Sequence, residues 1–420
     1  MGEFDGVERD IESIRLPEWG RVVAVDGVVP FAVVDPDGCP VDPIQRFLRD
    51  FVARDRSAGS VRSYAFDLHR WWRFLVAVEV SWDQATSAEV RDFVLWLGQA
   101  DKQRRHPRTR SRTTTGQVNP ITRKRYQDDR YQPRTIRHSN AVLRSFYEFA
   151  IDEKCGPLVN PVPRERPHGR RANAHHNPLE PFRAEGRLRY NPKLPRQHPR
   201  AVPDERWLEL FARMRSNRDR AILALAVSSG ARAGELLGLR LTDIDWGDQL
   251  IQVRRKGSRA AQWLPASAEA FVWLRLYFDE IGESESPNGF VWWTLRRRRV
   301  GPNGRLTRRQ LDYDALRAVL RRANDALGTN WSMHDLRHTA AIRMAQSRKL
   351  SMRDVQAIMG HAHLTTTQIY LVDDENAVLQ RVRRYLAEGA AYSESPQAPP
   401  PVSVGYDCAD LDVLFGGDRR

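Results

Sequence analysis

Residues 333–370 read MHDLRHTAAIRMAQSRKLSMRDVQAIMGHAHLTTTQIY, and this stretch decides how the rest of the chain is interpreted. His334 and Arg337 are three positions apart, so on a helix they share one face. An apolar stripe at helical spacing is expected to face the core; it comprises Leu336, Ala340 and Met344. The first part of the stretch is therefore predicted to be a helix that is anchored on one side and carries polar side chains on the other.

The second part of the stretch is predicted to be a short amphipathic helix that ends at Gly360, because glycine is common at helix C-termini. His361 follows at once, and Tyr370 lies nine positions later. Histidines and an arginine can bind a phosphate, and a phenol can act as a nucleophile. A lone HxxR pair is usually a helix surface and a lone tyrosine usually packs, so the interpretation depends on what accompanies them.

Three spaced motifs occur together: SSGARAGELLGLRLTDIDW from residue 228, HDLRHTAA from residue 334 and IMGHAHLTTTQIY from residue 358. Their order resembles the tyrosine recombinase (phage integrase) family, whose boxes take the forms G-x-R-x-x-E-L, H-x-L-R and L-G-H followed by T-x-x-Y. The resemblance implies a mainly α fold with a small antiparallel β-sheet: a helical, SAM-like core-binding domain and a mixed α+β catalytic domain. It also implies six catalytic residues: Arg232, Lys256, His334, Arg337, His361 and Tyr370.

Two of these six residues lie far upstream of the opening stretch. Arg232 opens the predicted helical segment RAGELLGLR, and Glu235, three positions later on the same face, is expected to steady it. LIQVRRKGSRAAQWLPAS predicts two strands joined at Gly257, and the resemblance places the catalytic lysine, Lys256, on this hairpin. On composition alone Lys256 would be a solvated turn lysine. Three further residues of the hairpin are predicted to hold DNA phosphates: Arg254, Arg255 and Arg259.

The resemblance implies that DNA is cleaved through a covalent 3′-phosphotyrosyl intermediate. A free phenol has a pKa of about 10 and a DNA phosphate repels nucleophiles, so the protein must activate one and neutralise the other. Arg232 and Arg337 can hold the non-bridging oxygens, and Tyr370 is the expected nucleophile.

Three other side chains complete the expected chemistry. His334 is expected to assist deprotonation of the tyrosine, His361 to donate a hydrogen bond to the phosphate, and Lys256 to protonate the departing 5′-oxygen. No cofactor and no metal are expected, since the sequence has neither a phosphate-cradling G-K-[ST] loop nor a carboxylate cluster at ligand spacing.

The charge balance favours a polyanionic partner. The 420 residues contain 67 Lys plus Arg and 53 Asp plus Glu, which gives a formal net charge of +14. Three widely spaced cysteines indicate neither a disulfide framework nor a cysteine metal site. No run approaches the roughly 18 apolar residues that a membrane span needs, and the start MGEFDGVERD is acidic. A cytoplasmic protein, nucleoid-associated when bound to DNA, is therefore expected.

The chain is long for a single core, and composition divides it into five segments. They are an N-terminal extension or arm (1–40), a helical core DNA-binding domain (41–159), a basic Pro-rich linker (160–200), the catalytic domain (201–390) and a largely disordered tail (391–420). In the second segment, the third of four helices is expected to close at Gly98, and the basic loop that follows is expected to contact DNA through Arg123, Lys124 and Arg125. In the fourth, FVWWT from residue 290 predicts a strand, and RRRRVGPNGRLTRRQ from residue 296 predicts a basic loop.

The implied partner is double-stranded DNA, and no membrane partner is expected. The resemblance also implies a homo-oligomer, a tetramer on two DNA sites, with a C-terminal helix at residues 376–389 as a docking element. Two other classes of function stay open: a catalytically inactive DNA-binding or accessory protein on the same scaffold, and a type IB-like topoisomerase. The intact set of six residues argues against the first, and strand exchange between two sites would exclude the second.

Overall fold

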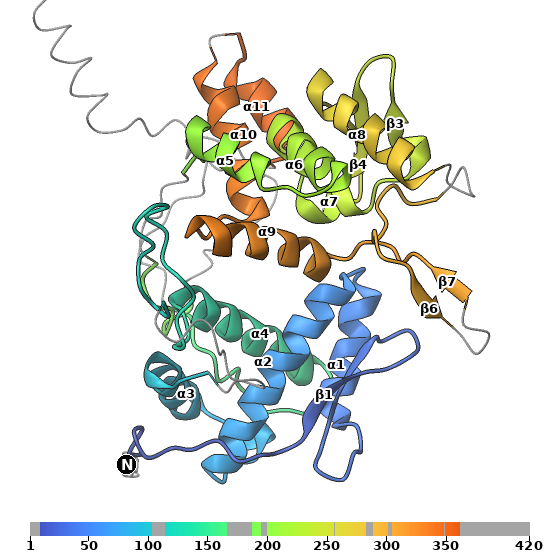
Figure 1. Cartoon of the computed structure of the whole chain (residues 1–420). Helices are drawn as coiled ribbons and strands as arrows, with labels where there is room; N and C mark the ends of the chain where they lie inside the picture. Colours follow the sequence, from blue (N-terminus) through green and yellow to red (C-terminus); the bar gives the residue numbers. More distant parts are fainter. Residues whose placement is uncertain are drawn as a thin grey trace, which may run out of the picture. The chain divides into compact units, whose positions relative to one another are not determined.

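Within the residues that the structure describes, the chain is mainly helical and its strands form three small antiparallel sheets. The structure, a computed structural model of the chain, describes residues 9–102, 114–165, 187–194, 200–255, 257–282, 289–300, 305–347 and 349–361. Figure 1 shows the elements, which divide between two compact units: residues 1–197 with Gly328–Asn330, and residues 198–327 with 331–420. The predicted fold class is confirmed.

The amino-terminal unit, residues 1–197 with Gly328–Asn330, is built around one aromatic core. Its elements are β1 (Arg21–Ala24), β2 (Phe31–Val34), α1 (Asp42–Ala53), α2 (Ala58–Ala77), the 3₁₀ helix η1 (Trp82–Gln84), α3 (Ser87–Gln99) and α4 (Pro133–Asp152). Trp71 of α2 is fully buried; its ring meets Phe93 of α3 edge to face, and its Nε1 donates to the hydroxyl of Tyr147 on α4 at 2.9 Å. The apolar periodicity of these helices therefore brings three of them together on one indole.

The predicted end of the third helix at Gly98 is wrong. The helix α3 runs on to Gln99, and the backbone N–H of Ala100 still donates to Trp96 O at 2.8 Å. Gly98 does not adopt the left-handed conformation through which glycine usually ends a helix. The glycine is therefore an interior residue of α3, and its position near the end of the apolar pattern was misleading.

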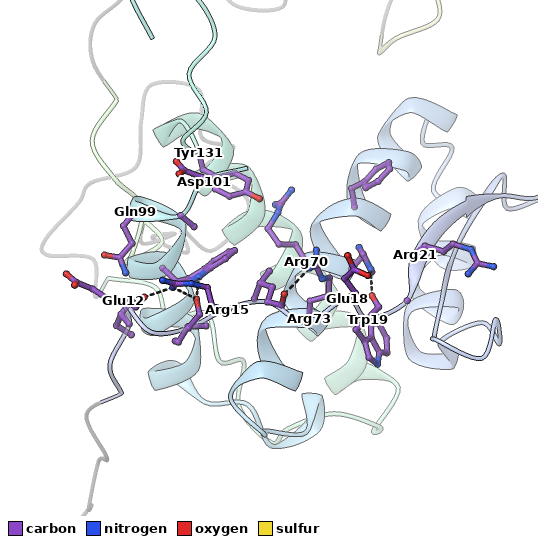
Figure 2. A pocket seen from close by; sticks show the side chains of 18 residues that line it. Glu12, Arg15, Glu18, Trp19, Arg21, Arg70, Arg73, Gln99, Asp101 and Tyr131 are labelled. Carbon is purple, nitrogen blue, oxygen red and sulfur yellow. Dashed lines mark hydrogen bonds between the residues drawn. The ribbon is translucent and has the colours of Figure 1, made fainter. Parts of the chain in front are cut away.

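Residues 9–20 of the predicted arm are held against α2 and α3. Side chains of these helices donate to its carbonyl groups: Arg73 to Pro17 at 2.7 Å, His69 to Trp19 at 2.8 Å and Trp96 to Ile14 at 3.1 Å. Beside these contacts lies a pocket of about 1120 Å³, and Figure 2 shows Glu12, Arg15, Arg70 and Tyr131 among its lining residues. None of the site residues predicted from the sequence lines this pocket.

The carboxy-terminal unit, residues 198–327 with 331–420, is organised around an apolar helix, α6. Its helices are α5 (Asp204–Ala212), α6 (Asn217–Ser229), α7 (Ala233–Leu237), the 3₁₀ helix η2 (Leu241–Asp243), α8 (Ala268–Ile281), α9 (Tyr313–Leu327), α10 (Met333–Gln346) and α11 (Met352–Met359). Residues 221–226 of α6 are all buried, so α6 is covered on every side, as expected of a helix without a polar face. It packs against α8 and α10, and α11 packs on α10 (Figure 1).

The strands of this unit form two sheets. β3 (Ile244–Asp245), β4 (Leu250–Arg254) and β5 (Ala261–Pro265) make a three-stranded antiparallel sheet in that order, and β6 (Arg298–Val300) pairs with β7 (Arg305–Thr307). Ile251 and Val253 of β4 are buried on one face, and Ile251 pairs with the buried Leu264 of β5. The predicted hairpin is confirmed, and Gly257 in its turn has φ 104°.

Two other strand predictions in this unit are wrong. FVWWT makes only isolated bridges, at Phe290 and Trp293, and the fully buried Val291 and Trp292 show that its apolar character reflects core packing. The arginine-rich segment from residue 296, predicted as a loop, instead contains the β6–β7 hairpin. Strand pairing is made by backbone hydrogen bonds, so a run of charged side chains does not prevent it.

No helix among the described residues is long and apolar enough to cross a membrane. Cys39 and Cys155 are free thiols. Within the described ranges no three His, Cys, Asp or Glu side chains are grouped as a metal site would require.

Replacing Gly230 by alanine is expected to lower the free energy of unfolding by about 1–2 kcal/mol, because Gly230 ends α6 in the left-handed region. Its φ is 67°, and an added Cβ would lie 2.9 Å from the sulfur of Met359. Gly234→Ala is the matched control, since nothing lies within 4 Å of a Cβ there. Urea unfolding of both variants measures the difference, and equal midpoints would show that position 230 accepts a Cβ without strain.

Candidate active site

Arg337 is buried at the centre of the candidate site, although it comes from a helix with a polar face. α10 begins with a capping box formed by Ser332 and Asp335, which satisfies backbone groups at the helix N-terminus and fixes where the helix begins. Arg337 is 4% exposed. Its Nη1 donates to Gly230 O and its Nη2 to Met359 O, each at 2.5 Å. One guanidinium thus connects the ends of α6 and α11.

His361 lies against this guanidinium. Gly360 ends α11 with φ 59°, as predicted, and His361 is held by two bonds to Gln356: its N–H donates to Gln356 O at 3.2 Å, and Gln356 Nε2 donates to His361 O at 3.0 Å. Arg337 Nη2 lies 3.3 Å from His361 Nε2. An arginine can only donate, so Nε2 accepts and the imidazole is neutral.

The electrostatic surroundings of His361 agree with a neutral ring. Burial, followed by the charges of Arg337, Arg232 and Arg255, lowers the pKa of His361 from 6.5 to about 4. Because the charges of three arginines reach one imidazole, residues separated by more than a hundred positions in the sequence are brought together here. The same field would favour a bound anion.

The stability of the protein is expected to depend on pH through His361. Between pH 6.5, the ordinary pKa, and about 4, the folded value, the unfolded chain binds a proton that the folded protein does not. The contribution of the neutral His361 to the free energy of unfolding is therefore fully present above pH 6.5, and it is lost as the pH falls towards 4. Urea unfolding of wild type and His361→Asn across this range measures it.

The comparison between the two proteins isolates this one group. His69 in the other unit also has a lowered pKa, caused mainly by burial, and it contributes equally to both proteins. The wild type should lose more stability on acidification than His361→Asn. Parallel pH profiles would show that His361 does not titrate as described.

Arg232 enters the site from the start of α7, where it is the N-cap residue. Its Nη1 donates to Oε1 of Glu235 at 2.8 Å, and its backbone N–H donates to Oε2 of the same carboxylate at 2.8 Å. The predicted steadying contact is present. Burial alone would raise the pKa of Glu235, but the bonds from Arg232 and the charges of Arg232 and Arg255 outweigh it and lower the pKa. Glu235 is therefore ionised and fixes the arginine.

His334 lies one turn before Arg337 on α10 and is exposed. Its ring packs edge to face against that of His338, with centroids 4.1 Å apart and an interplanar angle of 63°. His338 was not among the predicted site residues. The signal that could have found it is the i, i+4 spacing of the two histidines within HDLRH.

The other predicted residues are placed as follows. Tyr370 and Lys256 lie outside the described residues, as do most of the predicted linker, the C-terminal helix and the tail. Arg254 and Arg259 are exposed on the hairpin, whereas Arg255 is buried. In the amino-terminal unit Arg123 and Arg125 are exposed and Lys124 is half-buried. Their predicted contacts with DNA stay predictions.

Family profiles match both parts of the chain. The profile described as "Phage integrase family" matches residues 205–377, and "Phage integrase, N-terminal SAM-like domain" matches residues 44–115. Together they cover more than half of the chain. Among curated proteins, the tyrosine recombinase XerC of Pseudomonas fluorescens is 32% identical over 185 residues, 43% of this chain and 58% of the relative. That of Chromobacterium violaceum is 33% identical over 191 residues, 44% and 60% respectively. The chain thus spans less than two thirds of these relatives.

Solved structures of low sequence identity are also similar. A lambda integrase dimer bound to a COC′ core site has a TM-score of 0.49 at 14% identity, covering 78% of this chain and 76% of the other. XerH recombinase bound to a palindromic difH substrate has a TM-score of 0.47 at 16% identity, covering 82% of each. From the matches to both domain profiles and to the curated recombinases, the chain belongs to the phage integrase family of tyrosine recombinases.

Proposed function

We propose that the protein is a site-specific DNA recombinase that cleaves and rejoins strands through a 3′-phosphotyrosyl intermediate. The observation that carries the proposal is the convergence of Arg232, Arg337 and His361, which come from α7, α10 and the end of α11. Two guanidiniums and a neutral imidazole form a site for a phosphodiester, because arginine pairs with phosphate oxygens in two-point contacts. A bound phosphodiester would bring its negative charge next to the positive charges of Arg232 and Arg337.

In the proposed reaction, side chains of the protein act as nucleophile, base and acid. The phenol oxygen of Tyr370 attacks phosphorus, a P–O bond to tyrosine forms, and the P–O5′ bond breaks. His334 takes the phenolic proton, and Lys256 supplies a proton to O5′. Arg232 and Arg337 stabilise the charge that grows on the non-bridging oxygens. The phosphotyrosyl bond keeps the energy of the original linkage, so a 5′-hydroxyl from another strand can reverse the step.

His361 has a separate role in the proposed reaction. Its Nε2 accepts from Arg337, which leaves the proton of the neutral ring on Nδ1 as a donor for the phosphate. The imidazole is kept neutral by burial and by the neighbouring arginines. A neutral ring can accept from a guanidinium and donate to a phosphate without repelling the arginines.

The proposed partner is double-stranded DNA, recognised in part through Arg123, Arg125 and the exposed arginines of the hairpin. Recombination joins four strand ends from two duplexes, so a tetramer on two sites is the proposed assembly, with residues 376–389 as its docking helix. A protein with this role acts in the cytoplasm at the nucleoid. Phosphate contacts of this kind give affinity that falls with salt and little base preference.

A strand-exchange assay tests the function. Two duplexes of different length, both carrying DNA from the flanks of the reading frame and both shifted by the protein in a gel, are incubated with it. Recombinant products of intermediate length are expected. Relaxation of a supercoiled plasmid without exchange would identify a topoisomerase. Binding with neither reaction would identify an accessory protein and overturn the proposal.

A further inference from the structure

Arg255 is buried, although the other described arginines of its hairpin are exposed. It is the first residue after β4 and is 6% exposed. A buried guanidinium is costly unless carboxylates and hydrogen-bond acceptors compensate it. The compensation here includes a carboxylate, Glu235, whereas the acceptors named above for Arg337 are two carbonyls and an imidazole, so the charge of Arg255 is balanced by an acid of the protein.

Three elements supply the acceptors. Arg255 Nη1 donates to Oε2 of Glu235 on α7 at 3.2 Å, its Nε donates to Oε1 of Gln262 on β5 at 2.8 Å, and its Nη2 donates to the carbonyl of Ile358 on α11. A guanidinium carries its N–H donors on three separate nitrogens in one plane, so it can reach three acceptors that a single ammonium nitrogen could not span. Arg255 therefore links the hairpin to two elements of the site.

The first link leads to Arg232. One carboxylate, Glu235, lies between two guanidiniums: Oε1 accepts from Arg232, and Oε2 accepts from Arg255. Glu235 has only 3% of its side chain exposed, so water screens these interactions weakly. The carboxylate that orients Arg232 is thus itself oriented by Arg255.

The second link leads to His361. Ile358 O belongs to the last turn of α11, whose carbonyls have no partner within the helix. Gln262 Nε2 reinforces the link by donating to the neighbouring carbonyl of Ala357 at 2.9 Å. A cation at a helix C-terminus also complements the helix dipole. The hairpin thereby holds the end of α11, from which His361 projects.

Close packing at Gly360 makes this link rigid. A Cβ on Gly360 would lie 2.9 Å from Nε of Arg255 and 3.1 Å from its Cζ. The guanidinium therefore lies directly against the backbone of the residue before His361. Any movement of Arg255 changes the space available to the end of α11.

We propose that Arg255 is a positioning residue, which ties the carboxylate that orients Arg232 to the end of α11 and so sets Arg232 and His361 in register before DNA binds. This inference rests on the proposed function. It assigns Arg255 a role inside the protein in place of the phosphate contact predicted from sequence. Such preorganisation lowers the cost of reaching the transition state.

Three full-length variants test the role: Arg255→Gln, Arg255→Lys and, as the matched control, Arg275→Gln. Arg275 is an exposed arginine of α8 that pairs with Asp279 at 3.5 Å. The measurements are the single-turnover rate on a nicked duplex that wild type cleaves, the affinity for that duplex at several salt concentrations, and the NMR titration of His361.

Arg255→Gln is expected to lower the cleavage rate on the order of 10- to 100-fold, as small misplacements of reacting groups do. Its DNA affinity and salt dependence should match wild type, and the pKa of His361 should rise because one depressing charge is gone. Arg255→Lys keeps the charge without the fork, so its His361 should titrate nearly as in wild type while cleavage stays slow. Arg275→Gln should change neither the cleavage rate nor the titration of His361.

Two results would overturn the assignment. A weaker affinity with a salt slope reduced by about one would make Arg255 a phosphate contact. A wild-type cleavage rate in Arg255→Gln would remove its positioning role. Should Arg255→Gln not fold, Arg255→Lys decides: wild-type cleavage by that variant sinks the proposal. If wild type itself cleaves no bound duplex, the proposed function fails, which is a distinct outcome.

Discussion

Replacing Arg337 by lysine is expected to slow DNA cleavage on the order of 10²–10³-fold, the typical effect of losing one donor to developing negative charge. A lysine carries the same charge, but it has no planar fork. It cannot hold Gly230 O, Met359 O and a phosphate in the directions that the guanidinium serves. The measurement is the single-turnover rate on a bound, nicked duplex.

The same variant should also be less stable. One of two buried carbonyls loses its donor, which costs about 1–3 kcal/mol. Cleavage is therefore measured well below the unfolding midpoint. Arg343→Lys is the control on the same helix, because Arg343 forms a partly exposed pair with Asp204 at 2.5 Å and should affect neither quantity. An Arg337→Lys protein that cleaves as fast as wild type would show that Arg337 does not act on the phosphate.

Replacing Arg232 by glutamine is expected to reduce cleavage by a similar factor, on the order of 10²–10³-fold, with little loss of stability. Arg232 has 31% of its side chain exposed, so its tip is available to a ligand. Glu235 keeps the backbone N–H of residue 232 and the guanidinium of Arg255 as partners. The loss should therefore appear in the rate of the chemical step, with the unfolding midpoint nearly unchanged.

A matched pair elsewhere in the chain controls for the broken ion pair. Arg206 contacts Glu209 at 2.7 Å with the same i, i+3 spacing, but both side chains are exposed on α5. Arg206→Gln should leave cleavage and stability unchanged, since exposed pairs contribute about 0–1 kcal/mol. If both variants behave alike, the Arg232 pair is an ordinary surface contact.

The local part of the site could be predicted from sequence. The apolar stripe correctly gave Leu336 and Ala340 as the buried face of α10, and Gly360 marked the end of α11. Arg337, predicted to share the free face with His334, is instead buried. These inferences depend on helical periodicity and capping, which a short stretch contains in full. Glu235 beside Arg232 is predictable for the same reason.

What could not be predicted depends on contacts between distant segments. Arg255 and Arg254 are adjacent and chemically identical, yet one is buried and the other exposed, because strand alternation and the carbonyl of Ile358 decide it. The burial of Arg337 similarly requires Gly230, 107 positions away. No local pattern contains these partners. Composition also gave a wrong prediction of a loop at the β6–β7 hairpin, because a run of arginines does not reveal that the backbone pairs.

Mapping the covalent attachment of the protein to DNA tests directly whether Tyr370 is the nucleophile. Wild type and Tyr370→Phe are incubated with a nicked duplex that both bind equally in a gel shift, denatured in detergent, digested and analysed by mass spectrometry. Wild type is expected to give an adduct on the peptide that contains Tyr370, joined to a 3′-phosphate, and Tyr370→Phe is expected to give none. An adduct on another residue, or persistent cleavage by Tyr370→Phe, would contradict it.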